Sequence, residues 1–135
     1  MKTIKDIIAE LEKLEDKSAP LTIIASTNRE DPESGENFID GAVVQRVSVN
    51  ALDGRMDIKV SDEGTWTVSD ALTVLRKAGK PESVARVKIG YGAHPMTDSE
   101  GEPVSIRLVE DCTVLEEDVI WNVTLGEVVK TESED

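Results

Sequence analysis

Apolar residues near the N-terminus recur at spacings of three and four residues, which is the period of an amphipathic helix. The stripe consists of Ile4, Ile7, Ile8, Leu11 and Leu14. Thr3 followed by Asp6 has the form of a capping box, in which each side chain accepts a hydrogen bond from the other residue's backbone. The pattern predicts a helix over about residues 4–14 that ends before Pro20.

Strands are predicted over the rest of the first half. Apolar residues dominate positions 21–25, return from 38 to 49, and alternate with polar residues over 56–60. A loop is expected over 26–37, where turn-forming residues cluster, and a hairpin turn at Asp53 and Gly54. Gly41 stands where a bulge would interrupt the second of these strands.

The same order of elements begins again at residue 67. Thr67 and Asp70 have the capping-box form, and Gly79 is placed to end the helix that they begin. The apolar face of this second helix consists of Val68, Ala71, Leu72, Leu75 and Ala78. Strands are expected near 87–89, 104–108 and 119–125, with a loop over 90–102 and a frayed acidic tail at 131–135.

The two halves align with one another in order and in several residues. Residues 3–8 match 67–72 at an offset of 64, and residues 21–23 match 87–89 at an offset of 66. We therefore expect one α+β domain over 1–130, with two helices packed on a mainly antiparallel sheet and pseudo-repeat halves near 1–62 and 65–126. The alternative is a chance likeness between two capped helices, because the shared residues are mostly capping and core types.

The first 24 residues resemble a group of known sequences. Residues 3–14 read TIKDIIAELEKL and residues 18–23 read SAPLTI. This segment resembles the start of small uncharacterised phage and mobile-element accessory proteins, in which a capped helix and a short loop lead into the first strand of a small sheet. The resemblance implies an accessory role in a phage or mobile element and brings no catalytic residues with it.

The net charge of −13 is concentrated in the last third of the chain. Residues 1–88 carry 16 acidic and 13 basic side chains, whereas residues 89–135 carry 12 acidic side chains against Arg107 and Lys130. Such a balance argues against a nucleic-acid surface or an anionic membrane surface, both of which need clustered basic residues. A field of a single sign attracts a basic partner, although an acidic excess also serves solubility alone.

The leading functional hypothesis is a non-enzymatic protein that docks on a basic surface of a partner protein. One sharper form is a phage-type inhibitor that imitates the charge of nucleic acid. The residues predicted to form the docking face are Glu100, Glu102, Glu110, Asp111, Glu116, Glu117 and Asp118.

Candidate chemistry is sparse. Cys112 is the only cysteine, which excludes an intramolecular disulfide and a zinc site of several thiolates. The carboxylates beside it should raise its pKa, so we expect an unreactive thiol. His94 has no recognisable nucleophile or second histidine near it in sequence, and the acidic loops lack the spacing of an EF-hand. No cofactor or metal site is predicted.

The sequence leaves two alternatives open. A small-molecule or enzymatic site could lie in a cleft between the halves, lined by loops 26–37 and 90–102, with Tyr91 and His94 as its first candidates. A structural or assembly subunit would instead keep an apolar patch exposed. The sequence has no apolar run near 18 residues and no signal-peptide pattern at its start, so a cytoplasmic protein without a membrane span is expected.

Overall fold

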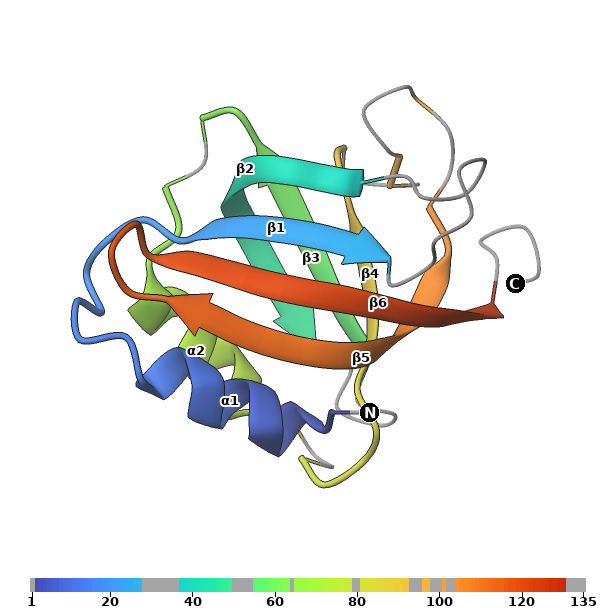
Figure 1. Ribbon diagram of the computed structural model, residues 1–135, viewed down its shortest axis with the longest axis horizontal. Helices are drawn as coiled ribbons and strands as arrows, with labels where there is room; N and C mark the ends of the chain where they lie inside the picture. The colour runs from blue at the N-terminus through green and yellow to red at the C-terminus, as the bar shows by residue number, and fades with distance from the viewer. Residues whose placement is uncertain are drawn as a thin grey trace.

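In the computed structural model of the chain, the described strands form a closed barrel, and the described helices pack beneath it (Figure 1). The structure describes residues 2–27, 37–49, 55–63, 65–78, 81–92, 96–97, 101 and 104–130. The helices are α1 (Ile4–Glu12) and α2 (Val68–Leu75). The strands are β1 (Thr22–Thr27), β2 (Asn37–Val49), β3 (Arg55–Ser61), β4 (Arg86–Gly90), β5 (Ile106–Leu115) and β6 (Ile120–Lys130). The predicted α+β class is confirmed.

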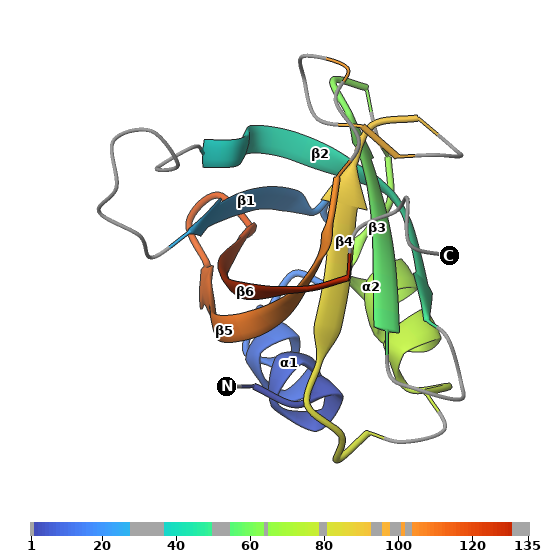
Figure 2. The ribbon, with the colours of Figure 1, turned by 90° about the vertical axis from the view of Figure 1, so that its right-hand side faces the viewer.

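The strands follow one another around the barrel in chain order. β1, β2 and β3 pair antiparallel, and so do β4, β5 and β6. Two parallel contacts, β3 with β4 and β1 with β6, join these two sets and close the barrel (Figure 2). The sheet is therefore mainly antiparallel, as predicted, and its closure removes the exposed edges that an open sheet would have.

The core fills the barrel and continues beneath it onto the helices. Both helices lie side by side below the strands in Figures 1 and 2, with their apolar faces toward the barrel. Ile4, Ile7 and Leu11 of α1 are buried, and so are Val68, Ala71, Leu72 and Leu75 of α2. These are the positions that the helical spacing predicted, so the amphipathic pattern alone identified the inward face of each helix.

Both predicted capping boxes are present with matching geometry. The Thr3 hydroxyl accepts a hydrogen bond from the Asp6 backbone at 3.1 Å, and the Asp6 carboxylate accepts one from the Thr3 backbone at 3.0 Å. Thr67 and Asp70 repeat these contacts at the same distances. Helix α1 ends at Glu12, two residues before its predicted end.

Two backbone contacts between distant segments recur at a fixed spacing along the chain. The Leu21 backbone donates to the Trp66 carbonyl at 2.9 Å, and 64 residues further on the Ala85 backbone donates to the Lys2 carbonyl at 2.8 Å. These contacts match Leu21 with Ala85, whereas the sequence alignment matched Leu21 with Val87. The spacing of 64 between these contacts equals the offset of the two capping boxes and differs from the offset of 66 in the sequence alignment.

The second hairpin differs from the prediction. The alternation at 104–108 predicted a short strand, but β5 starts at Ile106 and continues to Leu115 through several register shifts. These irregularities change which side chains face inward, so simple alternation fails. Val119, predicted to begin the last strand, lies in the turn before β6.

Gly41 occupies the bulge expected of it. Its φ is +75°, and the pairing of β1 with β2 shifts register between Ile23 and Ala25, which lie opposite this point. Glycine adopts this backbone conformation without steric cost. Helix α2 ends at Leu75 with Arg76 as its C-cap, so the prediction that it continues to Gly79 is wrong. The predicted turn at Asp53 and Gly54, the tail at 131–135 and most of the loop at 26–37 lie outside the described residues.

Candidate functional site

Five of the seven predicted docking residues lie on the hairpin formed by β5 and β6. Glu110 and Asp111 belong to β5, and Glu116, Glu117 and Asp118 form the turn that follows it. All five are exposed. The structure therefore brings these carboxylates onto one hairpin, as the charge distribution suggested. Glu100 and Glu102 lie outside the described residues.

Glu110 and Asp111 are neighbours in sequence, yet both face solvent. The pairing of β5 with β6 shifts register between Val109 and Asp111, which interrupts the alternation of inward and outward side chains. As a result, Val109 and Cys112 point into the core, and the two residues between them do not. A bulge thus allows two consecutive carboxylates to reach the surface.

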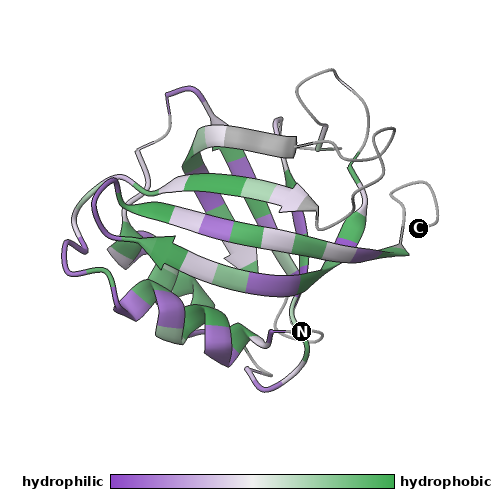
Figure 3. Cartoon of the chain, in the orientation of Figure 1, coloured by the Kyte–Doolittle hydropathy of each residue, from purple (hydrophilic) through white to green (hydrophobic). Residues whose placement is uncertain are grey.

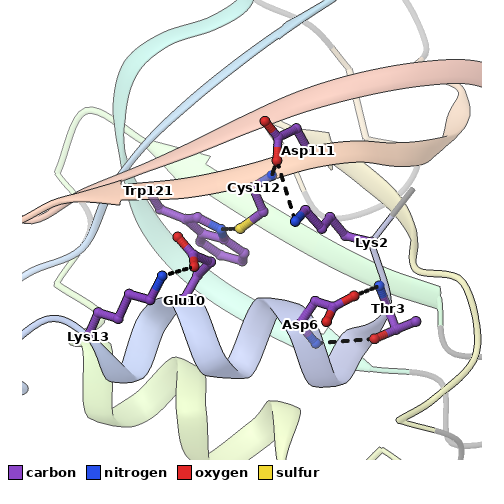
Figure 4. A network of polar contacts seen from close by, with 8 residues as sticks. All are labelled: Lys2, Thr3, Asp6, Glu10, Lys13, Asp111, Cys112 and Trp121. Atoms are coloured by element: carbon purple, nitrogen blue, oxygen red, sulfur yellow. Dashed lines mark hydrogen bonds and ion pairs between the residues drawn. The ribbon is translucent and has the colours of Figure 1, made fainter.

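Asp111 contacts Lys2, which precedes α1, and its own neighbour on β5. Its carboxylate accepts a hydrogen bond from the Cys112 backbone at 2.9 Å, and the Lys2 ammonium lies 3.8 Å away (Figure 4). Both members of this ion pair are substantially exposed, so it contributes little to stability. Part of the negative charge of Asp111 is nevertheless offset by Lys2.

Glu110 lies across the hairpin, toward β6. Its Oε2 sits only 2.7 Å from the position that a Cβ on Gly126 would occupy. The absence of a side chain at Gly126 therefore lets the Glu110 carboxylate lie over β6. The Gly126 carbonyl accepts a hydrogen bond from the Arg107 guanidinium at 3.0 Å.

The acidic turn is fixed by a residue with unusual backbone geometry. Val119 has a φ of 52°, a conformation that β-branched residues rarely adopt. Its carbonyl accepts a hydrogen bond from the Thr22 backbone of β1 at 3.2 Å, and its own N–H donates to the Glu116 carbonyl at 3.4 Å. Within the described part of the chain, the side chains of residues 116–118 form no ion pair closer than 4.0 Å.

Cys112 is enclosed in the core. Its sulfur accepts a hydrogen bond from the Trp121 indole nitrogen at 2.9 Å (Figure 4). Burial raises the pKa of the thiol to about 12, and the nearby carboxylates of Glu10 and Asp111 act in the same direction. The direction agrees with the sequence-based expectation, but burial is its main cause and the carboxylates are secondary.

The alternative ligand cleft stays a prediction. Tyr91 is half-buried against the core, and its backbone forms two hydrogen bonds with Thr97, at 2.7 and 2.9 Å. Burial, with a smaller effect from Asp62, raises the pKa of its hydroxyl. His94 lies outside the described residues, so the structure does not place the two candidates relative to one another.

Sequence reasoning missed a strip of charged side chains on the outside of β3 and β4. Arg55 lies opposite Arg86, and Asp57 lies opposite Lys88, in the parallel register of these strands. The Arg55 guanidinium is 3.3 Å from the Asp57 carboxylate. The alternation of charged and apolar residues along 55–60 carried this signal, but only the parallel pairing with β4 brings the two sets together.

No group of three or more His, Cys, Asp or Glu side chains among the described residues could hold a metal ion. No helix in the same part of the chain is long and apolar enough to cross a membrane. Comparison with known proteins found no matching protein-family model, no matching curated protein and no matching solved structure.

Proposed function

We propose that this chain is a non-enzymatic, cytoplasmic binding protein whose acidic C-terminal half docks on a basic surface of a partner protein. The observation that carries the proposal is the placement of five exposed carboxylates on the hairpin of β5 and β6. Lys2 pairs with one of them, and the three in the turn have no ion pair with another described residue.

The strength of such a field depends on how closely its charges lie. Glu116, Glu117 and Asp118 are consecutive, so their separations fall within the Debye length of about 8 Å at physiological ionic strength. Their fields therefore add, and a fixed turn presents them together. Charges of this kind raise the association rate with a complementary surface and make that rate depend on salt.

The internal duplication is a second part of the proposal. Isolated backbone bridges support it: Thr3 pairs with Val84, and Thr67 pairs with Pro20. Each member of one bridge lies 64 residues from a member of the other, and the two matching capping boxes have the same spacing. A unit of one helix and three strands, used twice, accounts for this recurrence, because one unit alone could not close a barrel.

The test of the docking function uses tagged protein and a lysate of its own host. Capture is repeated at salt concentrations from about 50 mM to about 500 mM, and the recovered partner is then used for kinetic measurements. The informative variant reverses the turn with Glu116→Lys, Glu117→Lys and Asp118→Lys. We expect its association rate with the partner to fall by about tenfold, with a weaker dependence on salt.

A matched control separates the position of the charges from their number. Glu15→Lys, Glu63→Lys and Glu82→Lys change the net charge by the same amount, at exposed positions outside the hairpin. We expect this control to change the rate by less than about twofold. A partner whose association ignores both salt and the turn variant would contradict the proposal. A nucleic-acid-binding partner displaced by DNA would favour the inhibitor that imitates nucleic-acid charge.

A further inference from the structure

We propose that the partner binds through an uncharged face on the outside of β1, β6 and the end of β5, which the acidic residues border. This inference rests on the proposed docking function and assigns its contact surface. The face consists of Thr22, Ile24, Ser26, Thr113, Leu115, Ile120, Asn122 and Thr124. We call it the β1–β6 face.

The strand register places these side chains in rows across the surface. Leu115, Ile120 and Thr22 lie opposite one another in one row, on β5, β6 and β1. Their neighbours two residues along form the next row, which contains Thr113, Asn122 and Ile24. The alternate residues of β1 and β6, such as Ile23 and Trp121, point into the core, so the rows face outward.

Thr113 and Leu115 are exposed, and the other side chains of the face are half-buried. The helices lie below the strands and none crosses β1 or β6 in Figure 1. Figure 3, in the same orientation, shows β1 in green and white and β6 mostly in these colours with some purple segments, and strong purple also appears on β5 and on α1. The largest exposed apolar side chain of the face is Leu115, which is 52% exposed.

The outside of the other parallel strand pair provides an internal comparison. At the outward positions of β3 and β4 the chain carries Arg55, Asp57, Lys59, Arg86 and Lys88. β-propensity acts on both parallel pairs alike, so it does not explain why one is charged and the other is not. Lys88 is only 5% exposed, which means that the protein itself covers part of the charged strip.

An uncharged centre with a charged border is the usual composition of a protein interface. Interface centres are depleted in charged residues, while polar and charged residues form the rim and direct association. Here the border is acidic: Asp111 lies opposite Thr124 at one side of the face, and residues 116–118 follow Leu115 at its end. The complementary partner is a protein with an apolar contact surrounded by Lys and Arg.

Electrostatic repulsion argues against a second copy of the chain as the partner that binds the β1–β6 face. Two copies meeting through this face would bring their acidic borders together, and each copy carries a net charge of −13. Like charges placed opposite one another oppose association. A basic partner removes this repulsion and replaces it with attraction.

Synthetic peptide arrays are the probe for this proposal. Each peptide carries one central aliphatic or aromatic residue between Lys or Arg flanks. One matched array replaces the flanks with Glu, and another replaces the centre with Ser. The strongest binder is then titrated into isotope-labelled protein, and the amide resonances that shift are identified by NMR.

Two variants accompany the titration. Leu115→Glu places a charge in the face, and Val129→Glu places one at a similarly exposed apolar residue, 43% exposed, at the far end of β6. We expect binding to need both basic flanks and an apolar centre, with shifts at Thr22, Ile24, Asn122 and Thr124. Leu115→Glu should weaken binding by about tenfold and Val129→Glu by less than about twofold, with unchanged melting of both variants.

The contrary results separate this inference from the function on which it rests. If binding needs basic flanks but shifts only the amide resonances of residues 116–118, the docking function stands and the β1–β6 face is wrong as the contact surface. Shifts of the amide resonances of Arg55, Asp57 and Lys88, in the charged strip on β3 and β4, would also leave the docking function standing and overturn the β1–β6 face. Concentration-dependent shifts of the face without peptide would identify a second copy as its occupant and overturn the basic partner. Absence of any binding that depends on basic flanks would overturn both proposals.

Discussion

The Trp121 indole nitrogen donates a hydrogen bond to the Cys112 sulfur across 2.9 Å inside the barrel. Trp121 is 0% exposed and Cys112 is 2% exposed, so no solvent is available to either group. A buried indole N–H needs an acceptor, and the sulfur supplies one from the adjacent strand. The cysteine therefore has a structural task, which explains a lone thiol without invoking reactivity.

Native Cys112 should resist alkylation. Its pKa of about 12 keeps the thiol protonated at neutral pH, and burial blocks reagent access. Iodoacetamide at about pH 8 should leave the folded protein unlabelled and label it once in denaturant, as measured by intact mass. Thr113→Cys, exposed on the same strand, is the positive control and should add one rapid label. Rapid labelling of Cys112 in the folded wild type would contradict the burial described here.

The same burial should make the protein less stable at alkaline pH. The folded pKa of Cys112, about 12, lies above its ordinary value of 9.0. The unfolded chain therefore releases the thiol proton first, and stability is lost as the pH rises from 9.0 toward 12. Urea unfolding at successive pH values should show a steeper alkaline loss for wild type than for Cys112→Ser. If the free energy of unfolding falls equally with pH in wild type and Cys112→Ser, ionisation of the thiol does not cause the alkaline loss of stability.

The two capping boxes should contribute similar stability. Thr3→Ala and Thr67→Ala each remove one hydroxyl acceptor in the same geometry, so each should lower the free energy of unfolding by about 1 kcal/mol. Thr73→Ala is the control: it lies inside α2, and its loss should be neutral or slightly stabilising. Chemical denaturation of the three variants measures the difference. A cost at Thr73 equal to that at the caps would contradict the capping argument.

Asp6 should titrate below its ordinary range. Its carboxylate accepts the Thr3 backbone N–H, which is the main reason that its pKa lies below 3.8, and the Thr3 hydroxyl adds a smaller effect. The folded state therefore loses this contribution as the pH falls below about 4. NMR titration should show the low pKa in the wild type and a partial rise in Thr3→Ala, because the backbone donor remains. If the pKa of Asp6 is unchanged in Thr3→Ala, the Thr3 hydroxyl does not help to lower it.

Local patterns in the sequence were enough for the helices and for most of the strands. The capping residues and the apolar spacing at Ile4, Ile7 and Leu11 identified α1 and its buried face without tertiary information. The alternation at Met56, Ile58 and Val60 did the same for β3. These signals are local because caps and periodicity depend only on residues within one element.

Features set by pairing between distant segments escaped prediction. Closure of the barrel depends on the parallel contact of β1 with β6, and no local pattern in either strand specifies its partner. The β5 bulges displaced the inward positions to Val109 and Cys112, so simple alternation gave the wrong limits for that strand. For the candidate site, the acidic hairpin could be predicted from charge. The β1–β6 face could not, because it exists only once the strands are in register.

The positive φ of Val119 offers a final prediction about the acidic turn. A valine at a φ of 52° is strained, whereas glycine adopts this conformation freely. In Val119→Gly, relief of strain should offset the loss of a half-buried side chain, so the free energy of unfolding should change by less than about 1 kcal/mol. Val43→Gly is the control, since Val43 is also half-buried, lies within the strand β2, and its loss should cost about 2 kcal/mol. Denaturant unfolding compares the two, and an equal cost at both positions would show that the backbone at Val119 is not strained.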